Sequence, residues 1–352
     1  MHKAFAIFVL VIFCFPTSAQ QIESFFEADH PLIEYTGRID FTNPKQPRFW
    51  QPGVYIQAKF KGSRCEIIIN DQVLWGNSHN YISVVVDGTV KRIQTRGQTN
   101  TILAAEGLAD GEHTLTICKS TESNIGYLEF IGIKCEKLLA VKKPQRKLEF
   151  IGNSITCGTG SDLSVIPCDA GQWYDQHNAY ESYGPTVARA LDAEWHLSAV
   201  SGIGLIHSCC NMKVTMPQVF DKVNQSDDTI AWDFNKYQPD AVTIALGQND
   251  GAQDSVTFSS AYVQFIRSIR SHYPKAHIVV LTSPMADEKL KALLKNYLSG
   301  IVKHVQDAGD KRVSKFFFSR SYNSGCGGHP DLQEHQLIAK ELTTYLKNTL
   351  KW

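Results

Sequence analysis

The sequence has no excess of either charge. Its 352 residues include 35 lysines and arginines and 35 aspartates and glutamates, and no long run of basic residues. A neutral chain of this kind gives no electrostatic reason to expect nucleic acid or an anionic membrane surface as its partner.

Long hydrophobic runs are also scarce. Beyond the first residues, no stretch approaches the roughly eighteen apolar residues that indicate a membrane-spanning helix. The apolar run from Ala4 to Phe15 follows Lys3 and precedes Pro16-Thr17-Ser18-Ala19, which is typical of a signal peptide cleaved after Ala19. We therefore predict that residues 1–19 are removed. The mature protein is then a secreted or periplasmic monomer that does not insert into a membrane.

Cysteine is too infrequent for a fold that depends on a dense disulfide scaffold. The sequence has nine cysteines, and Cys14 lies in the predicted signal peptide. Export permits disulfide bridges, although a chain of this size can bury a core without them. We expect bridges within two groups, and the spacing leaves their pairing open. Because both groups are odd in number, either each keeps a free thiol or one bridge joins them. The first group is Cys65, Cys118 and Cys135, and the second is Cys157, Cys168, Cys209, Cys210 and Cys326.

Residues 20–143 show the pattern of an all-β domain. Short runs of β-branched and aromatic residues alternate with turn signals such as Lys61-Gly62-Ser63 and Asp110-Gly111. Nothing repeats at a fixed period, which argues against a solenoid or a propeller. The pattern favours a β-sandwich or jelly roll. The expected strands are 55–60, 65–70, 81–86, 91–94 and 113–118.

A polar junction at 142–146 is followed by strands that alternate with helices. This alternation predicts a mostly parallel sheet with helices on both faces, which is a three-layer α/β/α domain over residues 144–352. The expected strands are 147–151, 194–200, 241–246, 277–282 and 315–319, and the expected helices are 183–191, 259–272, 287–306 and 332–350.

Polar and glycine residues follow the strands of this second half. The first strand ends on Gly152-Asn153-Ser154-Ile155, and similar blocks stand at 201–204, 247–250 and 328–330. A serine at the carboxyl end of a buried strand lies where a base can take its proton. The Gly-x-Ser-x-Gly elbow of α/β-hydrolases is excluded, because Thr156 occupies the position of its second glycine.

The four blocks resemble those of the SGNH (GDSL-type) hydrolases and stand in the same order. They read Gly-Asn-Ser-Ile, Ser-Gly-Ile-Gly, Gly-Gln-Asn-Asp and Gly-His-Pro. The resemblance implies that Ser154 is the nucleophile and His329 the general base. It also implies an oxyanion hole formed by the backbone amides of Ser154 and Gly202 and by the side-chain amide of Asn249.

Several of these positions also allow a structural interpretation. Gly204 can replace Gly202 as the donor, or both can be turn glycines. Asn249 or Asp250 can cap the following helix. His335 competes for the role of the base, but it falls on the last expected helix, where a histidine is more often solvated or packed.

Other chemistries fit the sequence less well. Cys157 lies near Ser154, but an exported cysteine beside other cysteines is more often bridged or buried than nucleophilic. The adjacent cysteines of His207-Ser208-Cys209-Cys210 do not have the spacing of a structural zinc site. We therefore expect neither a metal nor an organic cofactor.

The first half of the chain narrows the choice of family within the SGNH hydrolases. It contains Tyr35-Thr36-Gly37-Arg38, Trp50-Gln51-Pro52-Gly53 and Phe60-Lys61-Gly62-Ser63 ahead of the four blocks. A β-sandwich followed by an SGNH domain resembles carbohydrate esterase family 2, over almost the whole mature chain. The resemblance implies a serine esterase that removes acetyl groups from plant polysaccharides such as xylan or glucomannan. The alternatives are a lipid-type or general short-chain esterase, and a carbohydrate-binding protein of the same fold without turnover.

One position departs from the usual SGNH pattern. These enzymes usually carry an aspartate three residues before the catalytic histidine, but here that residue is Cys326. Similar members of carbohydrate esterase family 2 work as a Ser-His dyad. The resemblance therefore implies that a main-chain carbonyl orients His329, while Cys326 is bridged and structural.

Aromatic side chains near the site are the expected means of binding a sugar, because sugar rings present apolar faces. Three candidates lie in long irregular segments that flank the blocks, although each of them can instead pack under its own loop. They are Trp173, Tyr174 and Trp232.

Overall fold

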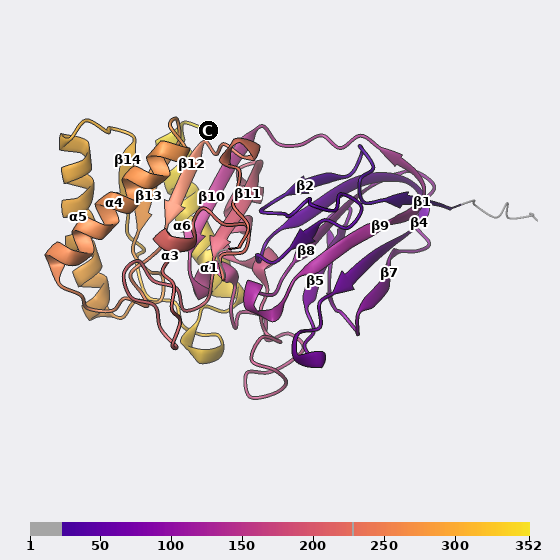
Figure 1. Ribbon diagram of the computed structural model, residues 1–352, viewed down its shortest axis with the longest axis horizontal. Coiled ribbons are helices and arrows are strands. Elements are labelled where there is room, and N and C mark those ends of the chain that lie inside the picture. The colour runs from indigo at the N-terminus through magenta and orange to yellow at the C-terminus, as the bar shows by residue number, and fades with distance from the viewer. Residues whose placement is uncertain (1–22, 227–228) are drawn as a thin grey trace, which may run out of the picture.

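The computed structural model describes residues 23–226 and 229–352, so the predicted signal peptide lies outside the described residues. The chain forms an antiparallel β domain, with strands from 24 to 139, beside an α/β domain, with elements from 146 to 350 (Figure 1). The expected fold class, an all-β domain followed by a three-layer α/β/α domain, is confirmed. Among these residues, no helix combines the length and apolar character needed to cross a bilayer.

The β domain is organised around β4 (Tyr55–Asp71), which pairs with β2, β7, β8 and β9. The sequence predicts a turn at Lys61-Gly62-Ser63, and this prediction is wrong. The segment is instead a shift of register within one continuous strand, with Gly62 at φ 109°. Such bulges bend a strand and allow it to pair with several neighbours. The other strands are β1 (Ser24–Glu27), β2 (Glu34–Thr36), β3 (Arg48–Phe49), β5 (Tyr81–Val86), β6 (Thr89–Gln94), β7 (Thr99–Ala105), β8 (Glu112–Lys119) and β9 (Leu128–Leu139).

The α/β domain has a five-stranded parallel sheet in the order β11-β10-β12-β13-β14. Alternate residues of β10 point to opposite faces, as the pleat of a strand requires. Leu148 and Phe150 join a core with α2 and α6, whereas Ile151 joins the core on the other face with α4 and α5. The strands are β10 (Arg146–Gly152), β11 (Ala193–Ala199), β12 (Ala241–Ile244), β13 (His277–Leu281) and β14 (Val313–Phe316). The helices are α1 (Ser154–Cys157), α2 (Tyr183–Ala190), α3 (Met216–Val219), α4 (Ser255–His272), α5 (Glu288–Asp307) and α6 (Leu332–Leu350), with short 3-10 turns at Leu74–Gly76, Ser123–Ile125, Ala179–Glu181, Phe234–Lys236 and Cys326–Gly328.

A buried ion pair joins the two domains. Arg38 of the β domain lies 3.1 Å from the carboxylate of Glu149 on β10, and both side chains are almost fully buried. The Arg38 guanidinium also donates to the backbone carbonyls of Phe220 and Lys222. Partners of this kind are what a buried charge requires, because the loss of its hydration must be offset.

Close packing completes this interface. The Trp195 indole on β11 donates to the Gly53 carbonyl at 2.9 Å, and its ring stacks on Tyr55 with centroids 3.9 Å apart. Gly53 has φ 74°, and a Cβ atom there would lie only 2.6 Å from the side chain of Leu197. The approach of the two domains therefore depends on glycine at this position.

The first group of cysteines forms no bridge, so the prediction of disulfides in this group is wrong. Cys65, Cys118 and Cys135 are free and buried, and Cys65 and Cys135 lie opposite each other on β4 and β9. Cys65 and Cys135 serve as small hydrophobic side chains within the apolar cluster of the β domain, and Cys118 does so in the cluster shared with the α/β domain. The second group forms two bridges, Cys168–Cys326 and Cys209–Cys210, and Cys157 stays free.

We predict that Arg38→Ala lowers the free energy of unfolding by about 3–5 kcal/mol, because it leaves the Glu149 carboxylate buried without its cation. Urea denaturation measures the loss. The control is Arg48→Ala: Arg48 lies 3.1 Å from Glu129, but its side chain is 40% exposed, so this pair is screened by solvent. Equal losses in the two variants would contradict the prediction.

Candidate active site

Ser154 stands on a tight turn at the carboxyl end of β10. Asn153 caps the single turn of α1, since its side chain accepts a hydrogen bond from the Ile155 amide at 3.3 Å. A Cβ atom at Gly152 would collide with the side chain of Thr156, so the strand can turn this sharply only with glycine there. The Ser154 side chain is thereby presented at the sheet edge, where the residue retains 7% of its exposure.

His329 is the hydrogen-bond partner of this serine. Its Nε2 lies 2.9 Å from Ser154 Oγ, and its Nδ1 lies 3.1 Å from the carbonyl oxygen of Cys326. When Nδ1–H donates to that carbonyl, the ring is fixed in the tautomer whose Nε2 can accept the serine proton. Burial lowers the pKa of His329, and the bond to the Cys326 carbonyl partly opposes this shift. The ring is therefore held in the neutral form that a general base needs.

The segment carrying His329 is tied to the serine turn. Cys326 is bridged to Cys168, and its amide donates to the carbonyl of Gly160 at 2.9 Å. A Cβ atom at Gly160, which has φ 64°, would lie 2.7 Å from the Cys326 carbonyl, so glycine is required for this approach. These contacts fix the carbonyl that orients the ring.

No carboxylate contacts His329 in the residues that the structure describes. Asp331 caps α6 by accepting from the Glu334 amide at 2.8 Å, and Glu334 accepts from the Ser324 amide at 2.7 Å. The competing base, His335, is fully buried and accepts from the Tyr183 amide through Nδ1 at 3.1 Å. Burial and the neighbouring His329 lower the pKa of His335 to about 3, which is the behaviour of a packed, neutral histidine.

The glycine block after β11 supplies a free backbone amide. Within the described chain, the amides of Ser154 and Gly202 have no hydrogen bond to a protein acceptor. Gly204 is less suited to be a donor, because its amide already donates to Ser208 Oγ at 3.0 Å. Asn249 Nδ2 donates one hydrogen to the carbonyl of Ile203 at 2.8 Å, which leaves its second hydrogen for a ligand.

Asp250 has a role that the sequence does not reveal. Its carboxylate accepts hydrogen bonds from the amides of Leu205, Ile206 and His207 at 2.7–3.0 Å. It does not cap the next helix, because α4 begins at Ser255 and is capped by Asp254. Asp250 therefore holds the loop that follows the glycine block. A carboxylate with distant backbone partners leaves no local sequence pattern.

The three aromatic candidates differ in exposure. Trp173 is 54% exposed, whereas Tyr174 and Trp232 are only 3% and 7% exposed. Trp232 lies in the domain interface, with its ring centroid 5.5 Å from the Arg38 guanidinium, so its assignment to a substrate site is wrong. Tyr174 packs edge-on against His79 with centroids 5.1 Å apart and presents no free face. Trp173 is the one candidate whose ring a sugar can reach.

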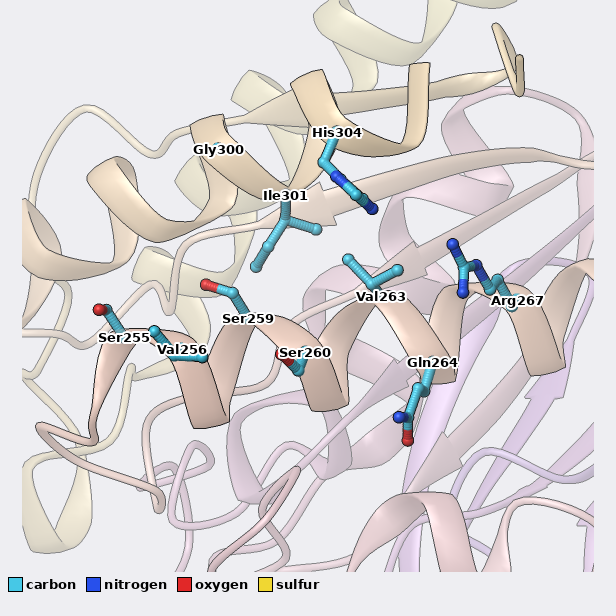
Figure 2. Close-up of a pocket in the computed structure, with 10 residues that line it drawn as sticks. All are labelled: Ser255, Val256, Ser259, Ser260, Val263, Gln264, Arg267, Gly300, Ile301 and His304. Carbon is cyan, nitrogen blue, oxygen red and sulfur yellow. The ribbon is translucent and has the colours of Figure 1, made fainter. Parts of the chain in front are cut away.

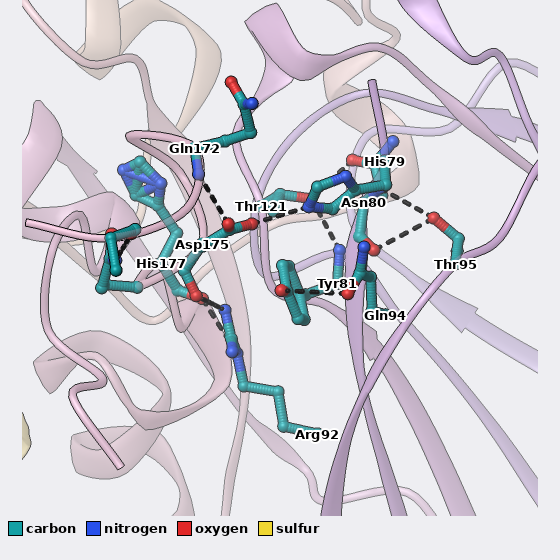
Figure 3. A network of polar contacts seen from close by, with 12 residues as sticks. His79, Asn80, Tyr81, Arg92, Gln94, Thr95, Thr121, Gln172, Asp175 and His177 are labelled. Atoms are coloured by element: carbon teal, nitrogen blue, oxygen red, sulfur yellow. Dashed lines mark hydrogen bonds and ion pairs between the residues drawn. The ribbon is translucent and has the colours of Figure 1, made fainter. Parts of the chain in front are cut away.

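The loop that carries Trp173 is held by the β domain. His79 Nε2 lies 2.6 Å from a carboxylate oxygen of Asp175, and Arg92 donates to the backbone carbonyls of Asp175 and His177 at 2.6 and 2.8 Å (Figure 3). The Trp173 ring meets His177 edge-on, with centroids 5.0 Å apart. A long loop that would otherwise be mobile is thus anchored to the β domain just after the tryptophan, at Asp175 and His177.

A large cavity lies elsewhere and contains none of these residues. It has a volume of about 580 Å³ and lies between α4 and α5, where Val256, Arg267 and His304 are among its lining residues (Figure 2). In the described part of the chain, no three histidine, cysteine, aspartate or glutamate side chains are grouped as metal ligands would be. The sheet edge offers a serine hydroxyl bonded to a histidine, together with neutral hydrogen-bond donors, and these are the kinds of group that acyl transfer needs.

Both domains match models of known families. Residues 35–144 match the model described as carbohydrate esterase 2 N-terminal, and residues 150–316 match the GDSL-like lipase/acylhydrolase family. Among solved structures, the chain is similar to a family two carbohydrate esterase from Clostridium thermocellum in complex with cellohexaose. The identity is 32% and the TM-score 0.82, and the match covers 91% of this chain and 99% of that one.

Two curated proteins are similar over nearly the whole chain. The cellulase/esterase CelE of Acetivibrio thermocellus is 33% identical over 345 residues, which is 93% of this chain but 40% of CelE. The chain thus spans less than half the length of that relative. An acetylxylan esterase / glucomannan deacetylase of Cellvibrio japonicus is 28% identical over 371 residues, and this match covers 100% of both chains.

We predict that the rate at which a fluorophosphonate labels Ser154 falls with decreasing pH through a midpoint below 6.5, the usual pKa of histidine. The sign follows from burial: the imidazolium of His329 is disfavoured, so the base stays neutral until the pH drops below that value. Mass spectrometry of the labelled protein gives the rate at each pH. Asp331→Asn should leave the midpoint unchanged, because that carboxylate does not contact the ring. A midpoint above 6.5 would mean that an anion stabilises the imidazolium.

Proposed function

The chain belongs to carbohydrate esterase family 2, and we propose that it is an exported serine esterase that removes acetyl groups from polysaccharides of the xylan or glucomannan type. The observation that carries the proposal is the 2.9 Å hydrogen bond between Ser154 Oγ and His329 Nε2. It lies at the carboxyl edge of a parallel sheet, which is where sites form in folds of this kind.

The acetyl group would be transferred twice. Ser154 Oγ attacks the acetyl carbonyl carbon as His329 Nε2 takes the serine proton. The carbonyl electron pair moves onto oxygen, and His329 then protonates the departing sugar oxygen, which leaves acetyl-Ser154. Water, deprotonated by His329, attacks this ester and releases acetate, so that the serine and the neutral histidine are restored.

The negative oxygen of each tetrahedral intermediate needs donors that are already in position. We assign the amides of Ser154 and Gly202 and the free Nδ2 hydrogen of Asn249 to this role. Since the Asn249 side chain also bonds the Ile203 carbonyl, it does not have to reorganise when the charge develops. Donors fixed in this way are a large part of the rate acceleration in acyl transfer.

The proposed base works without a carboxylate. A carboxylate would orient the ring and also stabilise the imidazolium, whereas the Cys326 carbonyl, 3.1 Å from Nδ1, mainly orients it. The surrounding contacts fix the orientation of the His329 ring, because Cys326 is held by its bridge to Cys168 and by its hydrogen bond to Gly160. We therefore infer a Ser-His dyad.

Trp173 is our proposed sugar platform. Its ring is exposed, and its loop is anchored to the β domain just after the tryptophan, where His79 and Arg92 bond to Asp175. A related esterase was solved with cellohexaose, which supports a β-linked oligosaccharide as the kind of chain that lies at such a site. A rigid aromatic ring gains contact area with a sugar at little cost in conformational entropy.

We predict that Ser154→Ala and His329→Ala each reduce acetyl-ester hydrolysis to near background, because loss of such a group costs up to roughly 10⁶-fold in turnover. Release of acetate from acetylated xylan and glucomannan gives the readout. Glu334→Gln and Asp331→Asn are the controls and should stay within a few-fold of wild type. Loss of nearly all activity in either control would identify a third catalytic member. A Ser154→Ala variant with more than a tenth of wild-type activity would exclude the proposed function.

We predict that Trp173→Ala raises KM for acetylated xylo-oligosaccharides by roughly tenfold, which corresponds to losing about 1.4 kcal/mol of stacking. Turnover of p-nitrophenyl acetate should be unchanged, since that ester is too small to need the ring. Tyr174→Phe, at a buried neighbour, is the control and should leave both constants unchanged. A lipid-type esterase would instead prefer long acyl esters and lose activity on them in Trp173→Ala.

A further inference from the structure

A carboxylate of the β domain reaches the proposed catalytic centre. Glu122 follows β8 and is fully buried, although it belongs to a loop of the first domain. Its Oε1 accepts from Thr159 Oγ1 at 2.5 Å and from Ser201 Oγ at 2.6 Å, and its Oε2 accepts from the Ser201 backbone amide at 3.1 Å. All of these donors belong to the α/β domain.

These partners stand directly beside the proposed catalytic groups. The Thr159 amide donates to the carbonyl of Ser154 at 3.0 Å, so Thr159 closes the turn that carries the serine. Ser201 immediately precedes Gly202, and its hydroxyl lies 2.9 Å from that of Thr159. One carboxylate thus clamps the serine turn to the glycine block.

We propose that Glu122 is a positioning residue that sets the oxyanion hole. It fixes the distance between Ser154 and the Gly202 amide by holding Thr159 and Ser201 together. The inference rests on the proposed function, because that function makes the Gly202 amide an oxyanion donor. It also makes the β domain a structural part of the catalytic centre in addition to the anchor of the Trp173 loop.

Glu122 is itself held in place before any substrate arrives. The Nζ of Lys119, also fully buried, donates to the backbone carbonyls of Thr121 and Glu122 at 2.9 and 2.8 Å. The hydroxyl of Thr121 bonds the side chain of Asn80, so the loop belongs to the polar network that also holds the Trp173 loop (Figure 3). A residue that positions others must have few rotamers open to it, and these contacts restrict the backbone from which Glu122 extends.

The proposed role depends on the length of the side chain more than on its charge. A glutamine has the same reach: its oxygen can accept from the Ser201 amide, and its nitrogen can donate to the two hydroxyls, which can turn to accept. An aspartate keeps the charge but is shorter by one methylene, roughly 1.5 Å. It cannot bond both segments in their present positions. The nearby ring of His177 lies 3.2 Å from Glu122 Oε1, but burial lowers its pKa to about 3, so it carries no charge that needs balancing.

The test compares Glu122→Asp and Glu122→Gln in steady-state hydrolysis of p-nitrophenyl acetate. We expect Glu122→Asp to lower kcat by roughly 10²-fold, the cost of misplacing a catalytic group by about 1 Å, with KM nearly unchanged. Glu122→Gln should stay within a few-fold of wild type. The inhibition constant of a trifluoromethyl ketone, whose serine adduct places a negative oxygen in the hole, should rise in Glu122→Asp in parallel with the fall in kcat.

Glu149→Asp is the matched control. Glu149 is equally buried, and its Oε1 accepts from Ser198 Oγ at 2.6 Å, which is the same distance as from Glu122 to Ser201. Ser198 lies within β11, away from the glycine block. Glu149→Asp should therefore lower thermal stability while kcat per folded molecule stays within twofold. If Glu122→Asp does not fold, Ser201→Ala replaces it in the test. This variant removes one of the three hydrogen bonds to the Glu122 carboxylate, and it should lower kcat several-fold with KM unchanged.

Three outcomes overturn the inference. The first is a Glu122→Asp enzyme, or in its absence a Ser201→Ala enzyme, whose kcat equals that of wild type. The second is Glu122→Gln with as large a loss as Glu122→Asp, which would mean that the charge matters. The third is a loss confined to KM. In each case the proposed function still holds if the wild-type enzyme is active and loses its activity in Ser154→Ala. If the wild-type protein does not hydrolyse acetyl esters at all, the proposed function itself is excluded.

Discussion

The parallel pairing of β10 with β11 on one side and β12 on the other determines where the candidate groups can meet. Parallel neighbours end at the same edge of the sheet. This edge therefore brings together three groups that are far apart in the sequence: the serine after β10, the glycine block after β11 and the asparagine after β12. Only the histidine arrives by another route, on the segment before α6. That segment therefore needs its own ties, and the Cys168–Cys326 bridge and the Gly160–Cys326 bond supply them.

The β domain contributes buried polar groups to this edge as well as apolar area. Arg38 meets Glu149, Arg92 meets the carbonyls of the Trp173 loop, and Glu122 meets Thr159 and Ser201. A buried polar group gains little stability, but it is costly to leave without its partner. Contacts of this kind therefore specify one arrangement of the two domains. An apolar interface of the same size would tolerate sliding.

The sequence predicts the α/β domain well because each element there carries a strong local pattern. Helix 332–350 has the bounds that the structure shows for α6, and β10 exceeds its expected range by one residue at each end. The β domain is harder to predict, because pairing between distant strands decides its structure. The Lys61-Gly62-Ser63 segment has a turn composition, yet long-range partners on both sides keep it within β4. The expected strands do not include β7 or β9, in which the alternation of polar and apolar residues is interrupted.

The same limit applies to the candidate site. Ser154, Gly202, Asn249 and His329 stand in a recognisable order along the chain, so a local pattern finds them. Glu122 lies in no such block, and the block that contains Asp250 does not reveal its role, because the partners of both carboxylates are tens of residues away. Trp232 shows the converse error: an aromatic residue in an irregular segment looks like a binding residue until its burial in the interface is known.

No carboxylate in the described residues contacts His329, and under the proposed mechanism this places a greater demand on the remaining groups. A carbonyl partner and a buried ring both leave the imidazolium poorly stabilised, so the histidine is a weaker acceptor of the serine proton than it would be in a triad. The transition state must then draw more of its stabilisation from the donors that face the developing oxyanion. Donor placement is most valuable under that condition, and we propose that the fully buried Glu122 of the β domain serves it at the Gly202 amide. The proposed dyad and the proposed clamp are in this sense complementary: the backbone orients the base, and the buried Glu122 side chain holds the donors in position.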